Sequence, residues 1–391
     1  MASARLRLSS LYAALFFELG INLPFFPIWL RAQDLDDFSI GLVVAAPLFA
    51  RILANPLVTA YADRYRRTPS TLLACATIVM VGTPFLAMTS GFPSILCLVI
   101  IIALAQGPLI ALADTIGLAA SSGGFGRKLD YGRMRLWGSV AFAVANLSAG
   151  TLLLWLSPAA IIGLLTVSAV ATVIAAMAAL RLPTSAPEEV MPADGASTPR
   201  LWRIGLVIAG AASIQASHGT VYAFSTLHWQ SEGLSSGTAG FLWALGVVSE
   251  IVVLAVAGRL VVGAAGPSIL VLLGGGAAIV RWLGMSLDPG ILPLSVLQLS
   301  HGLTFGATHI GSILILSRLA PAGMQAQVQG WLAASWAGLM AILIMVSGRL
   351  YPSEGEHTYL LMAAVAGIGV LLLCAALTGV GARKPMRAEA V

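Results

Sequence analysis

Long apolar stretches separated by short polar segments run along the whole chain of 391 residues. Each stretch is long enough to cross a hydrocarbon core of about 30 Å as a helix. The pattern therefore predicts an all-α membrane protein with twelve transmembrane helices. The first six are expected at 8–30, 39–62, 70–89, 92–119, 134–155 and 157–181, and the second six at 203–230, 237–262, 267–287, 290–318, 324–350 and 357–382.

Between the two sets lies the segment RLPTSAPEEVMPADGASTPR (181–200), which is rich in Pro, Ser, Ala and acidic residues. Such composition is typical of a flexible linker. We expect an N-terminal six-helix bundle at 1–182, a cytoplasmic linker at 183–202 and a C-terminal six-helix bundle at 203–391.

The two halves also repeat one another in sequence. The stretches 29–51 and 229–250 each begin with Trp, contain a Gly eleven or twelve residues on, and end on a charge, Arg51 or Glu250. The stretches QGPLIALAD (106–114) and HGLTFGATH (301–309) also match and end on Asp114 and His309. Repeats offset by about 200 residues indicate two bundles related by an axis normal to the membrane. Shared composition is the alternative explanation.

Composition supports this class and excludes others. Only 9% of the residues are charged and the mean hydropathy is +0.93, whereas a soluble domain has about 25% charged residues. The net charge of +5 comes from positions scattered between apolar runs, so we expect no nucleic-acid partner. Cys75, Cys97 and Cys374 show no ligand-like spacing, and neither a disulfide, a metal site nor a cofactor is expected.

The positions of Arg and Lys predict the orientation. If the N-terminus is cytoplasmic, 17 of the 21 basic residues fall in inside segments. The positive-inside rule then places both termini in the cytoplasm of a multi-pass inner-membrane protein. The first apolar run is too long for a signal peptide and contains Glu18, Pro24 and Pro27, so we interpret it as an uncleaved first helix.

Several ionisable side chains interrupt the predicted helices. A charge at the bilayer centre costs about 2.5–3.5 kcal/mol even on lenient scales, so such residues face a cavity or each other and are usually functional. They are Glu18, Arg51, His218, Glu250 and His301 near the midplane, Asp114 and His309 in the cytoplasmic half, and Arg281 in the outer half.

Glu250 is the strongest candidate for a functional charge. Burial favours the neutral form of a carboxyl group and a nearby cation favours the charged form, so a carboxyl group balanced between them can exchange a proton as a cavity opens to either side. Structural roles stay open for other residues: His218 and His309 as hydrogen-bonded core residues, and Arg51 as a counter-charge.

Two kinds of motif resemble the major facilitator superfamily. YADRYRRTP (61–69) resembles its loop signature, in which Asp-Arg, here Asp63 and Arg64, precedes a basic cluster; Thr59 and Arg66 stand where the signature has glycines. Five further stretches resemble the 3-phenylpropionate transporter family and, more distantly, lactose permease. They are PFFPIWL (24–30), LDYGRMRLWGSVAF (129–142), LGVVSEIV (245–252), IVRWLGMS (279–286) and LSHGLTFGATH (299–309).

The resemblance implies roles for individual residues. Arg135 matches the arginine that holds substrate in lactose permease, and Asp114 is the nearest acidic partner for it. Glu250 matches the glutamate that joins substrate binding to proton movement, and Arg281 and His301 match the arginine and histidine of helices 9 and 10. Thr304 and Gln298 replace a glutamate and a lysine of that permease, which argues against disaccharide recognition and an identical proton route.

Together these observations predict a proton-coupled symporter that works by alternating access as a functional monomer in membrane lipid, and not an enzyme. An arginine fork binds a carboxylate in two places, so an aromatic or other carboxylic acid is favoured as the small-molecule substrate. A sugar or nucleoside symporter is the alternative, followed by proton-driven efflux and, last, a membrane enzyme or receptor. The candidates for proton coupling are Glu250, Arg281, His301 and Glu18, those for substrate binding are Arg135, Asp114, Arg51, Trp137, His218 and His309, and those of the loop motif are Asp63 and Arg64.

Overall fold

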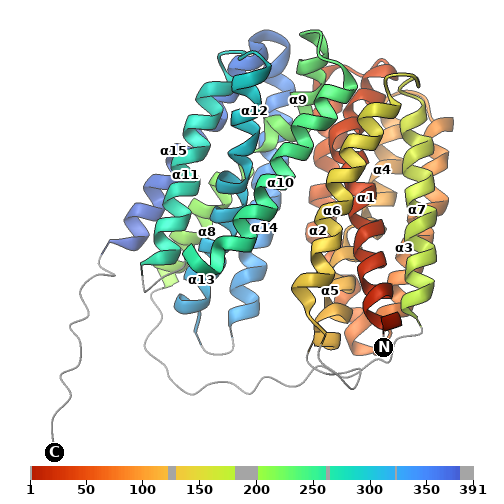
Figure 1. Cartoon of the computed structure of the whole chain (residues 1–391), viewed down its shortest axis with the longest axis horizontal. Helices are drawn as coiled ribbons and strands as arrows, with labels where there is room; N and C mark the ends of the chain where they lie inside the picture. Colours follow the sequence, from red (N-terminus) through yellow and green to blue (C-terminus); the bar gives the residue numbers. More distant parts are fainter. Residues whose placement is uncertain (1, 122–128, 181–200, 261–264, 322–323, 379–391) are drawn as a thin grey trace, which may run out of the picture.

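The computed structural model describes residues 2–121, 129–180, 201–260, 265–321 and 324–378. These residues fold almost entirely into helices that run side by side (Figure 1), which confirms the predicted all-α membrane class. Ten helical stretches are long and apolar enough to cross a membrane. The number of twelve spans stays a prediction.

The first half of the chain forms one group of helices, the N-terminal bundle, drawn from red to yellow in Figure 1. It contains α1 (Ala2–Ala32), α2 (Asp37–Arg64), α3 (Thr68–Phe85), a short 3₁₀ turn (Leu86–Met88), α4 (Phe92–Gln106), α5 (Pro108–Ser121), α6 (Tyr131–Leu152) and α7 (Ala160–Ala179).

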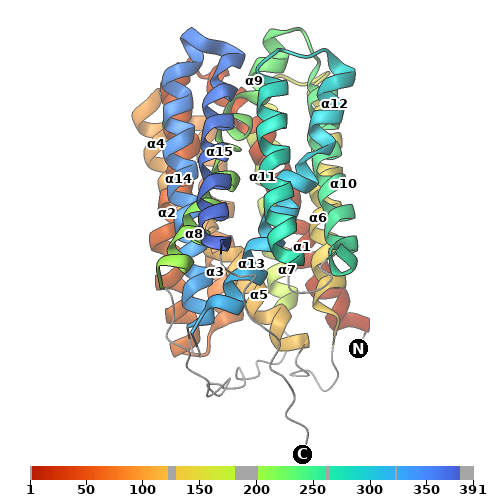
Figure 2. The same ribbon diagram turned by 90° about the vertical axis from the view of Figure 1, so that its left-hand side faces the viewer.

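The second half forms the C-terminal bundle beside it, drawn from green to blue (Figures 1 and 2). It contains α8 (Leu201–Ala216), α9 (Gly219–Ser231), α10 (Ser236–Leu260), α11 (Gly266–Met285), α12 (Ile291–Leu299), a π-helix (Gly302–Ala307), α13 (Thr308–Leu319), α14 (Gln325–Glu354), a 3₁₀ turn (Gly355–His357) and α15 (Thr358–Leu377). Residues 183–200 of the predicted linker lie outside the described residues, so the domain boundaries stay predictions.

Three of the expected continuous helices are broken near their middle. The span expected at 92–119 divides at Gly107, because Pro108 has no N–H to donate to the Leu104 carbonyl. The span at 203–230 divides at Ser217 and His218. The span at 290–318 contains the π-helix, and such segments occur often at functional sites. Each break lies beside one of the ionisable residues singled out in the sequence.

The two bundles pack tightly near one face only. We call the face where α1 begins the terminal face and the face where α2 begins the opposite face. Near the opposite face α6 meets α10 and α2 meets α14. A Cβ atom at Gly150 would lie 2.6 Å from the carbonyl oxygen of Ser236, and one at Gly348 would lie 2.7 Å from that of Asp37. Only glycine permits this approach, and we call these contacts the glycine seam.

The start of α2 at the opposite face is fixed by a side-chain cap. The Asp36 carboxylate accepts a hydrogen bond of 2.8 Å from the backbone N–H of Ser39, as N-cap residues do. The Ser39 hydrogen bonds lower the pKa of Asp36. The cap sets the end of α2 that packs on α14 in the glycine seam.

Candidate functional site

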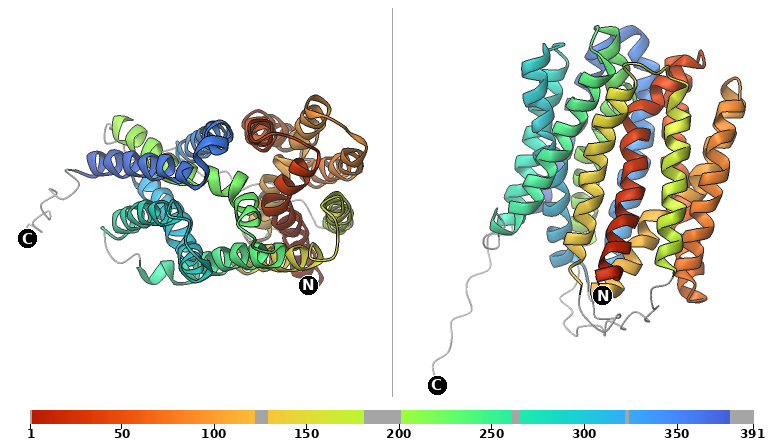
Figure 3. Two further views of the ribbon diagram at one scale, coloured as in Figure 1. Left: turned by 90° about the horizontal axis from the view of Figure 1, so that it is seen from above. Right: turned by 45° about the vertical axis from the view of Figure 1, so that its right-hand side comes forward.

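A cavity of about 1570 Å³ lies between the two bundles and is lined by residues of both. It reaches the terminal face, where the exposed Arg133 and Gln327 line it, and ends toward the glycine seam at Val43 and Ile344. The view from above in Figure 3 shows the two groups of helices on either side of this central region. The molecule is therefore open at the terminal face.

Most of the ionisable residues predicted for the site converge on this cavity. Two of the residues predicted for proton coupling or substrate binding do not line it. His218 is fully buried in the C-terminal bundle, and Trp137 lies on another side of α6, where it is 51% exposed. Those that do line it are Glu18, Arg51, Asp114, Arg135, Glu250, Arg281, His301 and His309.

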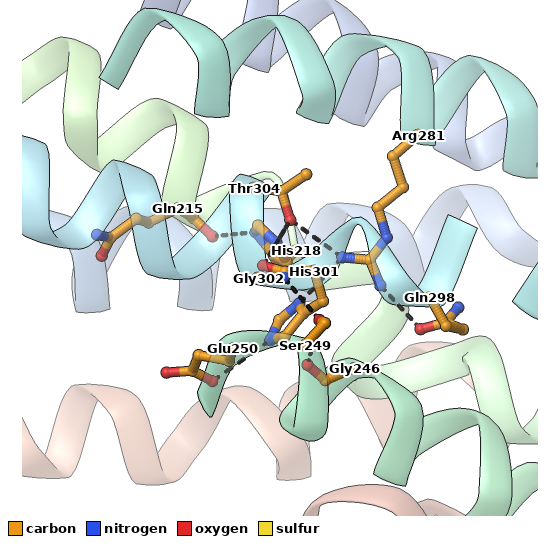
Figure 4. Close-up of polar contacts among 10 residues, drawn as sticks. All are labelled: Gln215, His218, Gly246, Ser249, Glu250, Arg281, Gln298, His301, Gly302 and Thr304. Carbon is orange, nitrogen blue, oxygen red and sulfur yellow. Dashed lines mark hydrogen bonds and ion pairs between the residues drawn. The ribbon is translucent and has the colours of Figure 1, made fainter. Parts of the chain in front are cut away.

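Arg281 on α11 organises a hydrogen-bond network in the C-terminal bundle (Figure 4). Its Nη1 donates to His301 Nδ1 at 3.0 Å and to Thr304 Oγ1 at 3.1 Å, and its Nη2 donates to Gln298 Oε1 at 2.8 Å. The residue is only 1% exposed. With both terminal nitrogens bonded inside the protein, this guanidinium is a fixed positive charge in the cavity wall.

Glu250 on α10 faces His301 across a short gap. Its Oε2 lies 3.9 Å from His301 Nε2, and its side chain is 27% exposed toward the cavity. That distance is too long for a direct hydrogen bond but suits a bridging water. Because Arg281 only donates, His301 Nδ1 is an acceptor and the neutral ring carries its proton on Nε2, on the Glu250 side.

The π-helix brings His301 and Glu250 together. The Gly302 N–H donates to Ser249 Oγ at 2.9 Å, and a Cβ atom at Gly302 would collide with the Ser249 carbonyl oxygen. At Gly306, by contrast, a Cβ atom would lie 3.4 Å from Glu250 Cγ, an ordinary contact distance. Gly302 is therefore the glycine of HGLTFGATH that allows the π-helix and α10 to approach closely.

His218 stands behind this network at the break between α8 and α9. Its Nδ1 lies 3.0 Å from the Gln215 carbonyl oxygen and its Nε2 3.0 Å from Thr304 Oγ1. The carbonyl oxygen can only accept, so Nδ1 carries a proton, and the other ring nitrogen contacts Thr304. His218 is therefore a hydrogen-bonded core residue and does not lie on the cavity wall. This is the structural role that the sequence had left open.

Asp114 has partners that sequence reasoning missed. Its Oδ1 accepts hydrogen bonds of 2.9 Å from both Tyr12 and Tyr131. Gly117 makes room for the Tyr12 hydroxyl. The expected pairing with Arg135 is not formed in the described residues. Tyr131 belongs to the LDYGRMRLWG motif, which was the available signal, whereas Tyr12 lies in an apolar run with none.

The two arginines of the N-terminal bundle that face deep into the cavity have no hydrogen-bond partner among the described residues. The Arg135 guanidinium lies over the ring of Phe16, 3.9 Å from its centroid, and lines the same cavity as Glu250. Arg51 faces Glu18, whose Oε1 accepts a 2.5 Å hydrogen bond from Gln106. Arg135 is therefore free to bind an anion, whereas Arg51 lies beside the Glu18 carboxylate.

Aromatic rings form an extended surface on the C-terminal side of the cavity. His301 stacks on Phe305 with centroids 5.4 Å apart, and Phe305 stacks on His309 at 6.1 Å. Trp336 approaches Phe305 edge to face, and Tyr222 stacks on Trp243. Trp336 and Tyr222 were not foreseen, because isolated aromatic residues in apolar helices carry no signal of the face they occupy.

The loop motif lies at the terminal face between α2 and α3. Asp63 and Arg64 are exposed there, and Arg66 has φ of +52°, a left-handed conformation that favours glycine. The position where the superfamily signature has its second glycine is therefore one where this chain adopts the backbone of a glycine.

Comparison with known proteins agrees with this geometry. The model of the MFS_1 like family matches residues 5–361. A probable 3-phenylpropionic acid transporter of Escherichia coli (strain K12) is 28% identical over 361 residues, which cover 91% of this chain and 93% of that protein. A maltose permease of Geobacillus stearothermophilus is 27% identical over 382 residues, covering 93% of each chain.

Solved structures share the fold. The nucleoside transporter NupG superposes with a TM-score of 0.78 at 17% identity, covering 96% of this chain and 99% of that chain. The D-xylose-proton symporter has a TM-score of 0.71 at 13% identity, with coverage of 96% and 97%. The human organic anion transporter MFSD10 has a TM-score of 0.64 at 16% identity, with coverage of 95% and 99%.

Proposed function

The chain belongs to the MFS_1 like family of major facilitator transporters, and we propose that it is a proton-coupled symporter that imports a small aromatic carboxylic acid. Membership of this family agrees with the prediction of a transporter rather than an enzyme. The observation that carries the proposal is the pairing of unbonded arginines with an aromatic surface in one cavity.

The substrate class follows from the chemistry of the two cavity walls. Arg135 and Arg51 offer guanidinium groups without protein partners among the described residues, and a guanidinium binds a carboxylate through two parallel hydrogen bonds. The stacked rings of His301, Phe305 and His309 offer an aromatic surface on the C-terminal side of the cavity. An aryl ring attached to a short acid chain fits both walls at once, and the relative named for 3-phenylpropionic acid supports this choice.

The proton site is argued from the hydrogen bonds around His301. A proton added to Nδ1 would break the hydrogen bond from Arg281. It would also place the imidazolium beside the guanidinium, and repulsion between the two positive charges disfavours this state. Glu250 has no hydrogen-bond partner among the described residues and lies in a cavity that solvent can reach. We therefore assign the transported proton to Glu250 and a positioning role to His301 and Arg281.

Orientation and movement complete the proposal. The positive charges predict that both termini lie on the cytoplasmic side of an inner membrane. The terminal face is then the cytoplasmic face, and the structure is open inward. Import requires the glycine seam to separate and the terminal face to close around the site. A monomer contains both bundles and suffices for this cycle.

The second candidate function is transport of a sugar or a nucleoside. Matches to a maltose permease and to a nucleoside transporter suggest a neutral solute. Neutral sugars, however, leave Arg51 and Arg135 without an anion. Proton-driven efflux by the same site ranks after import.

Uptake into liposomes tests the proposal. Purified protein is reconstituted, a pH gradient with an acidic exterior is imposed, and accumulation of labelled 3-phenylpropionate, maltose or a nucleoside is followed. We expect accumulation of 3-phenylpropionate that stops when a protonophore collapses the gradient. Accumulation of maltose or the nucleoside alone would replace the substrate class, and facilitated uptake that is indifferent to the pH gradient would remove proton coupling.

A further inference from the structure

The N-terminal bundle contains a second polar cluster, made of Glu18 on α1, Arg51 and Asn55 on α2, and Gln106 at the end of α4. The sequence repeat relates it to the cluster around Glu250. Glu18 and His218 each stand eleven positions before the matched Trp29 and Trp229, Arg51 matches Glu250, and Gln106 matches His301. Both bundles thus bring polar residues from equivalent helices to the cavity.

Glu18 is held but not neutralised by its neighbours. It is 4% exposed and accepts one hydrogen bond, from Gln106. The charges of Glu18 and Arg51 act on each other, yet the two residues form no ion pair within 4 Å. A carboxylate and a guanidinium at such separation can each be released to another partner.

Arg51 and Asn55 pack closely against Gly107 at the junction of α4 and α5. A Cβ atom at Gly107 would lie 2.7 Å from Arg51 Cγ and 2.9 Å from Asn55 Oδ1. This Asn55 oxygen is buried and has no hydrogen-bond partner among the described residues. Buried polar atoms normally have one. Because an amide oxygen only accepts hydrogen bonds, the unpaired oxygen indicates a donor such as a water molecule beside Arg51.

A water-sized space lies next to the pair. A cavity of about 20 Å³ is enclosed by α1, α2 and the α4–α5 junction and is lined by Glu18, Arg51 and Gln106 among apolar residues. Such a volume holds about one water molecule. Proton exchange at Glu18 therefore has both a polar neighbour and access to the main cavity.

The other charged groups on the helices that pack against α1 have partners of their own or lie elsewhere along the cavity. Asp114 on α5 is bonded to two tyrosines, Arg135 on α6 lies over Phe16, and α7 carries no titratable residue in its described range. Arg133 on α6 lines the mouth of the cavity and Glu250 on α10 lines its wall. His228 on α9 is bonded to Tyr351 and Asp288.

We propose that Glu18 is a second proton-binding group, whose protonation releases Arg51 to bind the carboxylate of the substrate. This inference rests on the proposed function and deepens it. When Glu18 is ionised, Arg51 is balanced by it and a second anion is repelled. When Glu18 takes up a proton, one positive charge is left for the incoming carboxylate, and the charge of the cluster is unchanged overall.

The exchange links binding to proton uptake in the N-terminal bundle. After the substrate leaves, Arg51 is unbalanced until Glu18 releases its proton and becomes its counter-charge again. A buried guanidinium without an anion is costly, so the empty transporter returns with Glu18 ionised. Together with Glu250, two protons then accompany one carboxylate, and one net positive charge enters with each substrate.

Proton uptake on substrate binding is the test. Binding of 3-phenylpropionate to purified protein is measured calorimetrically in buffers of different ionisation enthalpy, for the wild type, Glu18→Gln and the control Glu232→Gln, whose carboxyl group is exposed at the opposite face. We expect Glu18→Gln to bind the acid with about one proton fewer per molecule than the other two. Equal proton uptake in the wild type and Glu18→Gln would overturn the inference and leave the proposed function standing.

A second variant tests the anion site even if Glu18→Gln fails to fold. Arg51→Gln should bind 3-phenylpropionate at least tenfold more weakly, whereas its affinity for the neutral 3-phenylpropionamide should equal that of the wild type. Equal losses for both compounds, or no loss for the acid, would remove Arg51 from the site. Failure of the wild type to bind 3-phenylpropionate at all would instead contradict the proposed function.

Discussion

Nη1 of Arg281 lies 3.0 Å from Nδ1 of His301, so this imidazole nitrogen accepts a hydrogen bond and holds no proton. The remaining proton of His301 is on Nε2, on the side of Glu250. One buried arginine therefore fixes both the charge and the tautomer of the histidine, and leaves the carboxyl group as the member of the cluster that can change its charge.

Replacing this arginine should damage both stability and transport. In Arg281→Lys a single ammonium cannot reach His301, Thr304 and Gln298 together. A buried polar group left unpaired costs about 1–3 kcal/mol, so we expect a lower thermal unfolding midpoint and loss of accumulation. Arg349→Lys, an exposed change at the opposite face, is the control. A midpoint equal to that of the wild type would show that the network does not stabilise the bundle.

Arg135→Lys should weaken substrate binding. Lysine can neither lie flat over Phe16 nor make a two-pronged contact with a carboxylate. We expect the affinity for 3-phenylpropionate, measured by calorimetry, to fall by about tenfold, which corresponds to about 1.4 kcal/mol. Arg5→Lys, exposed at the start of α1, should bind as the wild type does. Unchanged affinity in Arg135→Lys would exclude this residue from the site.

A larger side chain in the glycine seam should open the opposite face. In Gly240→Leu the new Cβ atom would collide with the carbonyl oxygen of Asn146. We expect the distance between spin labels at positions 32 and 232, in a background without the native cysteines, to increase. Gly163→Leu, where no atom lies within 4 Å of the added Cβ, is the matched control. An unchanged distance in Gly240→Leu would mean that the seam does not hold this face closed.

The cap of α2 should contribute to stability in a pH-dependent way. Asp36→Ala removes the acceptor for the Ser39 N–H, at a cost of about 1 kcal/mol. Because the folded pKa of Asp36 is lowered, the stabilisation is present above the unfolded value of about 3.9 and is lost as the pH falls through the folded value. Hydrogen exchange near residue 39 should be faster in Asp36→Ala than in the wild type at pH 7 but not in Asp36→Asn. Equal protection in Asp36→Ala would contradict a role for the cap.

Much of this arrangement follows from the sequence. A carboxyl group in the apolar run around Glu250 has to face a polar interior, since lipid would penalise it, and the structure places it on the cavity wall. The residue correspondence between the two bundles that the sequence repeat suggests stays a prediction.

Other features depend on packing that a single sequence does not contain. Arg135 and Trp137 stand two positions apart, about 200° around a helix of 3.6 residues per turn, so the cavity can receive only one of them; the structure gives it Arg135. The tyrosine partners of Asp114 come from different helices, and the turn of α1 that carries Tyr12 has no marker in an apolar run. The π-helix likewise depends on the close approach of α10.

Transport by Glu250→Gln tests the central claim most directly. In liposomes with an acidic exterior, we expect this variant to show no accumulation of 3-phenylpropionate above equilibrium while still exchanging it across the membrane. A permanently neutral side chain binds substrate but cannot release a proton, and in our proposal the empty transporter returns only after both Glu250 and Glu18 have lost their protons. Glu232→Gln should accumulate as the wild type does. Full proton-driven accumulation by Glu250→Gln would contradict the account.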